Sequence, residues 1–298
     1  MSRPDIVVVG SLNADLVLNV ATLPAPGETV IGRRRREVTL GGKGANQAAA
    51  AAAALGLPGS VAMIGCVGDD AVGRMMGADL AARGVDVTRL RVVSGPSGQA
   101  IVAVDQRGQN LIIVEPGAND EVAAADVTGD EVRDARVVLM QLEIPLETVA
   151  AAARIARGVV ILNPAPARGI GPLLPYVDLI VPNRTELAVL ANSDPAADLD
   201  EVVRQVRSLG TVSRAVVTLG SDGAMVVDPD EGAFHIPAPE VPVVDTTGAG
   251  DCFCGALAAS LARGAGFREA TETAVRAASL SVSGVGARRM FPQELESK

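Results

Sequence analysis

The 298-residue sequence contains one histidine and three cysteines, and these low counts exclude several kinds of chemistry. His235 is the only histidine, so neither a histidine-based metal centre nor a histidine-containing triad is available. Cys66, Cys252 and Cys254 are an odd number in a chain of this size, which does not indicate a disulfide framework. We therefore expect a reducing compartment, with the cytoplasm as the default.

The chain also lacks an excess of basic residues and an uninterrupted apolar span. Its formal net charge of -9 argues against nucleic acid as the main partner. The longest apolar stretch, residues 48–67, is interrupted by Gly56, Pro58 and Gly59, and it predicts a buried helix followed by a strand. The first ten residues contain Asp5 and lead into a strand pattern, so they do not resemble a signal peptide. We expect no membrane association.

Two common nucleotide-binding motifs are missing. The loop after the apolar run 6–9 is not G-x-G-x-x-G, so a dinucleotide oxidoreductase has no support. The segment 41–44 reads Gly-Gly-Lys-Gly, but it lacks the spacing of a Walker loop, and no Ser or Thr follows Lys43. Its glycines nevertheless permit close approach to a ligand, and Lys43 and Asn46 offer donors. We expect this segment to open a helix over 48–55.

The order of predicted elements indicates an α/β fold. The strand patterns within 85–114 have no helices among them, and together with those within 16–40 they predict a small antiparallel sheet. From residue 137 onward, strands and helices alternate, which is typical of a mostly parallel sheet with helices on both faces. The last helix is expected over 267–284.

The stretch 243–253, Val-Val-Asp-Thr-Thr-Gly-Ala-Gly-Asp-Cys-Phe, carries the clearest chemical signal. We expect a strand to end at 241–244 and a helix to cover 256–261. Between them, Gly248 and Gly250 allow consecutive N–H groups to surround an anion, and Asp251 could accept a proton. This combination fits phosphoryl transfer to a hydroxyl group. The alternative is that Asp251 only caps the helix.

Three other polar positions have two interpretations each. Asn13 and Asp15 follow the first strand, where they could bind a polar ligand or form a turn. Asn183 and Glu186, spaced i, i+3, suit Mg²⁺ or a capping box. The small residues 220–223 suit phosphate contact or a β-turn.

Taken together, these motifs resemble the ribokinase-like carbohydrate kinase family. The resemblance covers nearly the whole chain and is carried by Asn13-Ala14-Asp15, 24–29, 41–47, 140–143, 162–167, 182–186, 218–220 and 243–253. It implies one domain, residues 1–298, built as a three-layer αβα sandwich with a central mostly parallel sheet. It also implies a β-sheet lid, with strands within 11–40 and 92–116, that covers a sugar and commonly pairs in a homodimer.

The resemblance further implies ATP-dependent phosphorylation of the 5-hydroxyl of D-ribose, and it assigns roles to individual residues. Those implied for the sugar are Asn13, Asp15, Gly41, Gly42, Lys43, Asn46, Glu143 and Asp251. Those implied for catalysis are Asp251 as base, with Gly248, Ala249 and Gly250 as the anion hole. Those implied for ATP are Asn183, Thr218, Leu219, Gly220, Ser221, Gly223, Gly250 and Val275. Mg²⁺ is implied at Asn183 and Glu186, and an activating K⁺ at Asp245, Thr247, Ser281, Gly284 and Gly286.

The sequence departs from the family pattern at three positions. Arg288 and Met290 stand where the family often has Gln and Ser, which weakens the expectation of K⁺ activation. Val275 stands where an Asn or His often faces adenine, which predicts a looser nucleotide preference. A kinase for another sugar, such as deoxyribose or a ketose, is the alternative within the family. A non-catalytic sugar or nucleotide sensor is the alternative outside it, and the presence of Asp251, Lys43 and Glu186 argues against it.

Overall fold

The computed structural model describes residues 3–34, 38–107, 109–210, 214–284 and 286. Its main sheet runs in the order β15-β14-β13-β12-β11-β10-β1-β5-β6, and β7 also pairs with β5. The strands are β1 (Ile6–Val9), β5 (Val61–Gly68), β6 (Val85–Asp86), β7 (Leu90–Val93), β10 (Val137–Met140), β11 (Val159–Leu162), β12 (Leu179–Ile180), β13 (Arg214–Thr218), β14 (Ala224–Asp228) and β15 (Gly232–Ile236). Pairing is parallel except at β13–β14 and β14–β15.

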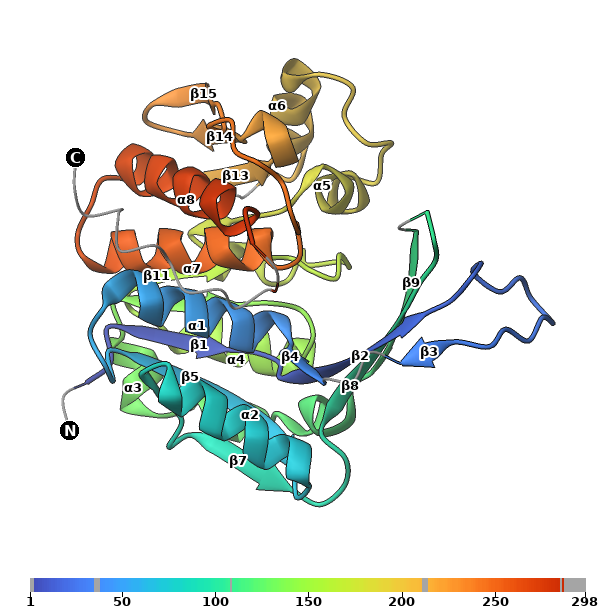
Figure 1. Cartoon of the computed structure of the whole chain (residues 1–298). Helices are drawn as coiled ribbons and strands as arrows, with labels where there is room; N and C mark the ends of the chain where they lie inside the picture. Colours follow the sequence, from blue (N-terminus) through green and yellow to red (C-terminus); the bar gives the residue numbers. More distant parts are fainter. Residues whose placement is uncertain (1–2, 35–37, 108, 211–213, 285, 287–298) are drawn as a thin grey trace.

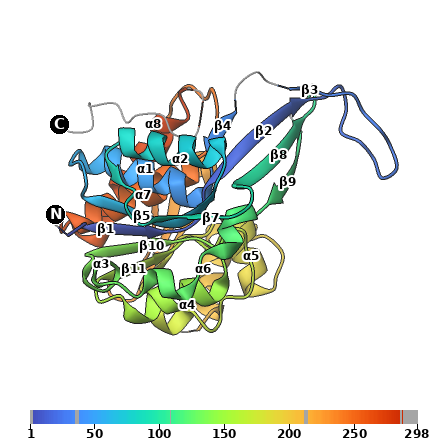
Figure 2. The same cartoon turned by 90° about the horizontal axis from the view of Figure 1, so that it is seen from below.

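Helices cover both faces of this sheet (Figure 2). One face carries α1 (Lys43–Leu55), α2 (Ala71–Ala82), α7 (Ala249–Ala262) and α8 (Phe267–Ser281). The other carries α3 (Asp130–Asp134), α4 (Leu146–Ile155), α5 (Arg184–Ala191) and α6 (Leu199–Ser208). Ile6 and Val8 pack into the first layer, whereas Val7 and Val9 pack into the second. Because side chains alternate across a strand, apolar residues at every position of β1 fill both cores. The expected three-layer α/β fold is confirmed.

Short 3₁₀ helices occupy parts of the connections. They are η1 (Gly117–Glu121), η2 (Ala124–Val127), η3 (Leu174–Tyr176) and η4 (Gly220–Asp222). Among the described residues, no helix combines the length and the apolar character needed to cross a membrane.

A second, smaller sheet projects sideways from the body of the protein (Figure 1). It consists of β2 (Asn13–Asn19), β3 (Arg33–Arg34), β4 (Thr39–Gly41), β8 (Gly98–Val104) and β9 (Asn110–Glu115). The expected separate sheet is confirmed, but two details of the expectation are wrong. β2 and β8 run parallel, and β6 and β7, from the segment 85–93, pair with β5 in the main sheet.

Several predicted boundaries are also wrong. α1 begins at Lys43, not near Ala48, and α7 begins at Ala249, not near Ala256. Residues 241–244 form no strand, since Val244 and Asp245 donate their N–H groups to Val282 O after the last turn of α8. α8 itself ends at Ser281. At the start of α1 and at residues 241–244, contacts with a distant part of the chain accompany the difference from the prediction.

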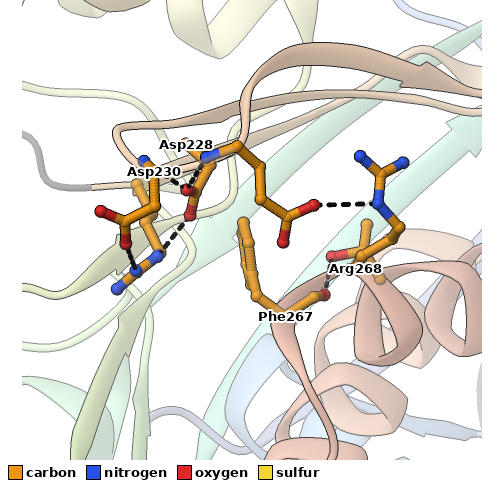
Figure 3. A network of polar contacts seen from close by, with 7 residues as sticks. Asp228, Asp230, Phe267 and Arg268 are labelled. Carbon is orange, nitrogen blue, oxygen red and sulfur yellow. Dashed lines mark hydrogen bonds and ion pairs between the residues drawn. The ribbon is translucent and has the colours of Figure 1, made fainter.

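Polar contacts hold the β14–β15 hairpin against the start of α8 (Figure 3). Arg214 pairs with Asp228 and Asp230, and Arg268 pairs with Glu231 at 2.9 Å. The Arg268 guanidinium also lies 3.5 Å from the centre of the Phe234 ring. The Arg268 contacts join the hairpin to α8, whereas the Arg214 pairs join β13 to the same hairpin.

Candidate active site

The site is built where the parallel strands end. Because β1, β10, β11 and β12 run in the same direction, the residues after them meet at one edge of the sheet, which is where α/β proteins bind ligands. Ser11, Gln141, Asn163 and Val181 follow these strands. The first turns of α1 and α7 lie at the same edge.

The N-terminus of α1 depends on distant polar groups. Gly42 precedes the helix with φ of 86°, and a Cβ there would lie 2.6 Å from Asn13 N, so only glycine fits. The carboxylate of Glu143 accepts the Lys43 N–H at 3.0 Å and also the hydroxyl of Ser11. This carboxylate therefore satisfies an N–H group that the helix leaves unpaired, and the helix begins earlier than its composition predicts.

The N-terminus of α7 presents backbone N–H groups toward a cavity. Gly248 is its N-cap with φ of 76°, a conformation that favours glycine. Ala249 N donates to Thr246 O, whereas the N–H groups of Gly250 and Asp251 have no acceptor within the described residues. Such N–H groups at a helix start form an anion-binding site. The anion-hole role of Gly248, Ala249 and Gly250 stays a prediction, and of these three the Ala249 N–H is already paired with Thr246 O.

Asp251 is held by two side-chain amides from α1. Asn46 Nδ2 donates to Asp251 Oδ2 at 3.0 Å, and Gln47 Nε2 donates to Asp251 Oδ1 at 3.0 Å. The residue is 8% exposed and lies in the first turn of α7, after the N-cap Gly248. The alternative interpretation, in which Asp251 serves as the helix cap, is therefore wrong.

Lys43 is a half-buried cation among carboxylates. Burial by itself would lower the Lys43 pKa, but Asp251, Glu143 and Glu186 outweigh it, and the pKa is raised above its ordinary value. Lys43 therefore carries its charge at neutral pH. Burial also raises the pKa of Glu186, which Asn183 N–H and Lys43 only partly oppose. A cation placed beside Glu186 would relieve this desolvation.

Asn183 and Glu186 form the capping box of α5. Asn183 Oδ1 accepts Glu186 N–H, and Glu186 Oε2 accepts Asn183 N–H, both at 2.8 Å. The capping interpretation is thus confirmed, and the Mg²⁺ role stays a prediction. The two roles are compatible, because a carboxylate offers about four lone-pair positions.

Two adjoining cavities meet at these groups. The smaller has a volume of about 210 Å³, and it is lined by Lys43, Asn163, Val181, Asn183, Glu186, Thr218, Thr246, Gly248, Ala249, Gly250, Asp251 and Cys254. The larger has a volume of about 730 Å³, and its lining includes Asn183, Thr218, Gly220, Ser221, Gly223, Thr246, Ala249, Gly250, Phe253, Val275, Ala278 and Val282. The shared residues Asn183, Thr218, Thr246, Ala249 and Gly250 join them. The volume of the larger cavity lies in the usual range of small-molecule and cofactor sites.

Most residues expected to contact a nucleotide line the larger cavity. Leu219 is the exception, since its side chain is buried in the core beneath η4. Val275 lies in the lining together with Phe253 and Ala278, so this part of the cavity is apolar.

The residues expected to contact a sugar are grouped beside the smaller cavity. Asn13 and Asp15 lie on strand β2, not in a turn, and Asn13 pairs in register with Gly41. Asn13 is buried, and its Oδ1 accepts Asn119 Nδ2 at 2.7 Å. Glu143 joins this group through the Lys43 N–H. None of Asn13, Asp15, Gly41, Gly42, Asn46 and Glu143 lines the two cavities above.

The proposed K⁺ ligands are partly brought together. Asp245 Oδ1 accepts Thr247 N–H at 2.9 Å, and Asp245 Oδ2 accepts Gly286 N–H at 3.0 Å. Ser281 is the last residue of α8, and Gly284 lies in the segment after this helix. Arg288 and Met290, the two departures from the family pattern, lie outside the described residues.

The sequence interpretation missed four polar residues that the structure places at the site. Gln47 and Asn163 contact each other beside Asp251, Asn119 holds Asn13, and Thr246 lines both cavities. The sequence did contain a feature that could have indicated Gln47 as a site residue, because it is a polar residue at the start of an alanine-rich helix. Cys254 also lines the smaller cavity, but burial raises the pKa of its thiol well above the ordinary value, so the thiol is protonated.

A model of the pfkB family of carbohydrate kinases matches residues 3–294 of the chain. The chain therefore belongs to the pfkB family carbohydrate kinases, and the family expected from the motifs is confirmed.

Known relatives match almost the entire chain. The ribokinase of Schizosaccharomyces pombe is 39% identical over 306 residues, covering 98% of this chain and 96% of the relative. The deoxyribokinase of Salmonella typhimurium is 34% identical, covering 97% and 95%. The solved structure of Arabidopsis thaliana ribokinase complexed with ribose and ATP aligns with a TM-score of 0.86 at 34% identity, covering 98% of this chain and 96% of that chain.

Proposed function

We propose that this chain is an ATP-dependent kinase that transfers the γ-phosphoryl group to the 5-hydroxyl of D-ribose, giving D-ribose 5-phosphate and ADP. The observation that carries the proposal is the position of Asp251. This carboxylate lies at the junction of the α7 N-terminus and the cavity that contains Lys43. The relatives named ribokinase and the neighbour that binds ribose and ATP support the choice of substrate.

In this proposal, each group at the site has one task. Asp251 accepts the proton of the sugar hydroxyl as that oxygen attacks the phosphorus. The α7 N-terminus at Gly248, Ala249 and Gly250 faces the transferring phosphoryl group, with the N–H of Gly250 as the donor that Thr246 O does not already occupy, and Lys43, charged because nearby carboxylates raise its pKa, lies beside the same cavity. The proposed sugar contacts are Asn13, Asp15, Gly41, Gly42, Lys43, Asn46 and Glu143.

The nucleotide and its metal fit the donor groups present. The larger cavity has an apolar part at Val275 and a polar end at Asn183 and Thr218, as a nucleotide requires. Mg²⁺ is commonly held by one or two carboxylates, waters and the substrate's phosphates, and Glu186 with Asn183 fits this pattern. Mg²⁺ would there neutralise phosphate charge. K⁺ activation through the Asp245 loop and a looser nucleotide preference at Val275 are further parts of the proposal.

We also propose a homodimer formed through the second sheet, which acts as a lid, in a cytoplasmic enzyme. Ile101 and Ile113 are register partners on adjacent strands and are 40% and 57% exposed. By alternation they lie on the face opposite Asp15, together with Leu16. An exposed apolar row on a sheet face is typical of an interface.

The test is a coupled ADP-release assay with Mg²⁺-ATP and a panel of D-ribose, 2-deoxy-D-ribose and D-fructose. We expect the highest kcat/KM with D-ribose, and phosphorus-coupled carbon NMR should place the new phosphate on O5. Asp251→Asn should lower kcat by about 10²–10⁴-fold. Asp86→Asn is the matched control, because among the described residues the Asp86 carboxylate accepts only the Thr88 N–H, in an exposed position. Wild-type turnover by Asp251→Asn would refute the role of the base.

Deoxyribose is the second candidate, because the deoxyribokinase relative also matches almost the entire chain. A site that pairs its polar groups with the 2-hydroxyl rejects the deoxy sugar strongly, since those groups are otherwise left unpaired. A higher kcat/KM with 2-deoxy-D-ribose would therefore replace ribose as the proposed substrate. Ribose binding without any ADP release would support the sensor alternative.

A further inference from the structure

Gln47 lies at the centre of a chain of buried side-chain amides behind Asp251. It is fully buried on α1, and its Nε2 lies 3.0 Å from Asp251 Oδ1 and 3.1 Å from Asn163 Oδ1. Its Oε1 accepts a hydrogen bond from Gln141 Nε2, and Gln141 is also fully buried. The amide group of Gln47 therefore has three partners, each from a different element.

The direction of these hydrogen bonds is fixed by a backbone carbonyl. Val181 O can only accept, so Asn163 must turn its Nδ2 toward it, and the two atoms lie 2.8 Å apart. The Oδ1 atom of Asn163 then faces Gln47 and can only accept. Gln47 must therefore present its NH₂ group, whose two hydrogens serve Asn163 and Asp251. The reversed amide would set oxygen against oxygen at both positions.

We infer that Gln47 is a positioning residue that fixes the plane of the Asp251 carboxylate for proton acceptance, through an amide chain that starts at Val181 O. This inference rests on the proposed role of Asp251. The terminal torsion of an aspartate is soft, so hydrogen bonds, not the rotamer preference, determine the direction of the carboxylate. Gln47 on Oδ1 and Asn46 on Oδ2 hold it at two points. Each oxygen keeps a further lone-pair position for the substrate hydroxyl.

The amide chain is not needed to pack α1 against α7. These helices meet closely through small residues, since a Cβ at Gly255 would lie 2.5 Å from Ala50 Cβ. Loss of the Gln47 amide therefore affects the direction of Asp251 more than the distance between the helices. A positioning role predicts a change in kcat and in its pH dependence, whereas a purely structural role predicts a change in stability alone.

The test is Gln47→Met, which keeps a similar length and removes the donor. We expect kcat to fall by about 10- to 100-fold, as for a catalytic group displaced by about 1 Å, with KM for sugar and ATP unchanged. The acid limb of the pH–rate profile should move to higher pH, because a carboxylate that loses a donor is protonated more readily. Gln205→Met is the matched control, since Gln205 is also buried and, in the part of the chain that the structure describes, its amide nitrogen donates only to Ser193 Oγ and Asp194 O. That control should keep wild-type kcat.

Three outcomes decide the inference. Wild-type kcat and pH profile in Gln47→Met, together with an inactive Asp251→Asn, would overturn the positioning role while leaving the proposed function intact. An active Asp251→Asn would instead refute the proposed function.

Folding of Gln47→Met is checked by the rise in its Tm on adding ADP, because Gln47 does not line the nucleotide cavity and its loss should leave ADP binding intact. If Gln47→Met does not fold, the Gln141→Met variant tests the inference instead. It removes the hydrogen-bond donor to Gln47 Oε1 and does not touch Asp251. It should lower kcat several-fold and shift the acid limb in the same direction, and wild-type kinetics would overturn the inference.

Discussion

The close contact between α1 and α7 gives a sharp prediction for Gly255→Ala. Gly255 lies on α7 one turn after Asp251, and a Cβ at this position would lie 2.5 Å from Ala50 Cβ and 2.7 Å from both Ala51 N and Gln47 O. Two of these are backbone atoms of α1, so no side chain can rotate away. The added methyl group must push the helices apart.

The magnitude follows from these distances. Non-bonded carbon atoms normally lie about 3.5–4.0 Å apart, so the helices would separate by roughly 1 Å. Such overpacking costs about 1–3 kcal/mol. Replacing a helical glycine by alanine returns about 0.5–1 kcal/mol. We expect a net loss of up to about 2.5 kcal/mol, and the displacement of Asp251 from Asn46 and Gln47 should lower kcat by up to about 100-fold.

The assay combines urea denaturation with steady-state ADP release. Gly77→Ala on α2 is the matched control, because the nearest atom to a Cβ there is Leu90 Cδ1 at 3.9 Å. This control should gain about 0.5–1 kcal/mol and keep wild-type kcat. If Gly255→Ala were as stable and as active as the wild type, the packing of α1 on α7 would not control the position of Asp251.

Three further predictions concern the charged groups and the second sheet. Burial raises the pKa of Glu186, so its contribution to stability is present below the ordinary value of 4.5 and is lost as the pH rises through the raised pKa. Glu186→Gln keeps a capping box, and in thermal melts at pH 8 it should show a higher Tm than the wild type but gain less from Mg²⁺-ATP. The Lys43 pKa is raised by carboxylates despite burial, so its stabilisation is present below 10.5 and is lost above the raised pKa. The Tm of Lys43→Met should therefore be lower than that of the wild type at pH 8, and the difference between the two Tm values should shrink toward pH 11. A Tm difference that stays constant with pH would contradict this. Ile113→Lys should shift sedimentation toward the monomer, whereas Ile31→Lys, at a 91% exposed position outside the strands, should not.

The edge of the main sheet where the site lies was predictable from sequence, because it follows from local patterns. A continuous apolar run such as 6–9 indicates a strand buried on both faces. The residues after such strands must meet when the strands are parallel. The segment 248–251 predicted a helix start with unpaired N–H groups, which the described residues show at Gly250 and Asp251, whereas the binding of an anion there stays a prediction. In both cases, the evidence lies within about ten residues of sequence.

The boundaries and the amide chain were not predictable in this way. α1 begins at Lys43 because Glu143, 100 residues away, accepts its N–H group, and no local pattern contains that contact. Val243 and Val244 have strong strand propensity, yet they are 66% and 59% exposed and pair with no strand. Gln47, Gln141, Asn163 and Asp251 come from separate elements, and only the fold brings them together.

The charges around the smaller cavity show why the proposed metal and nucleotide belong together. Lys43 is one cation facing Asp251, Glu143 and Glu186, so these side chains leave an excess of two negative charges. The helix N-termini of α1 and α7 offset only part of this excess, since each contributes about half a positive charge. A nucleotide triphosphate without a cation would meet net repulsion here. We therefore infer that Mg²⁺ supplies the missing positive charge beside Glu186, whose pKa is raised by burial and only partly lowered by Asn183 N–H and Lys43.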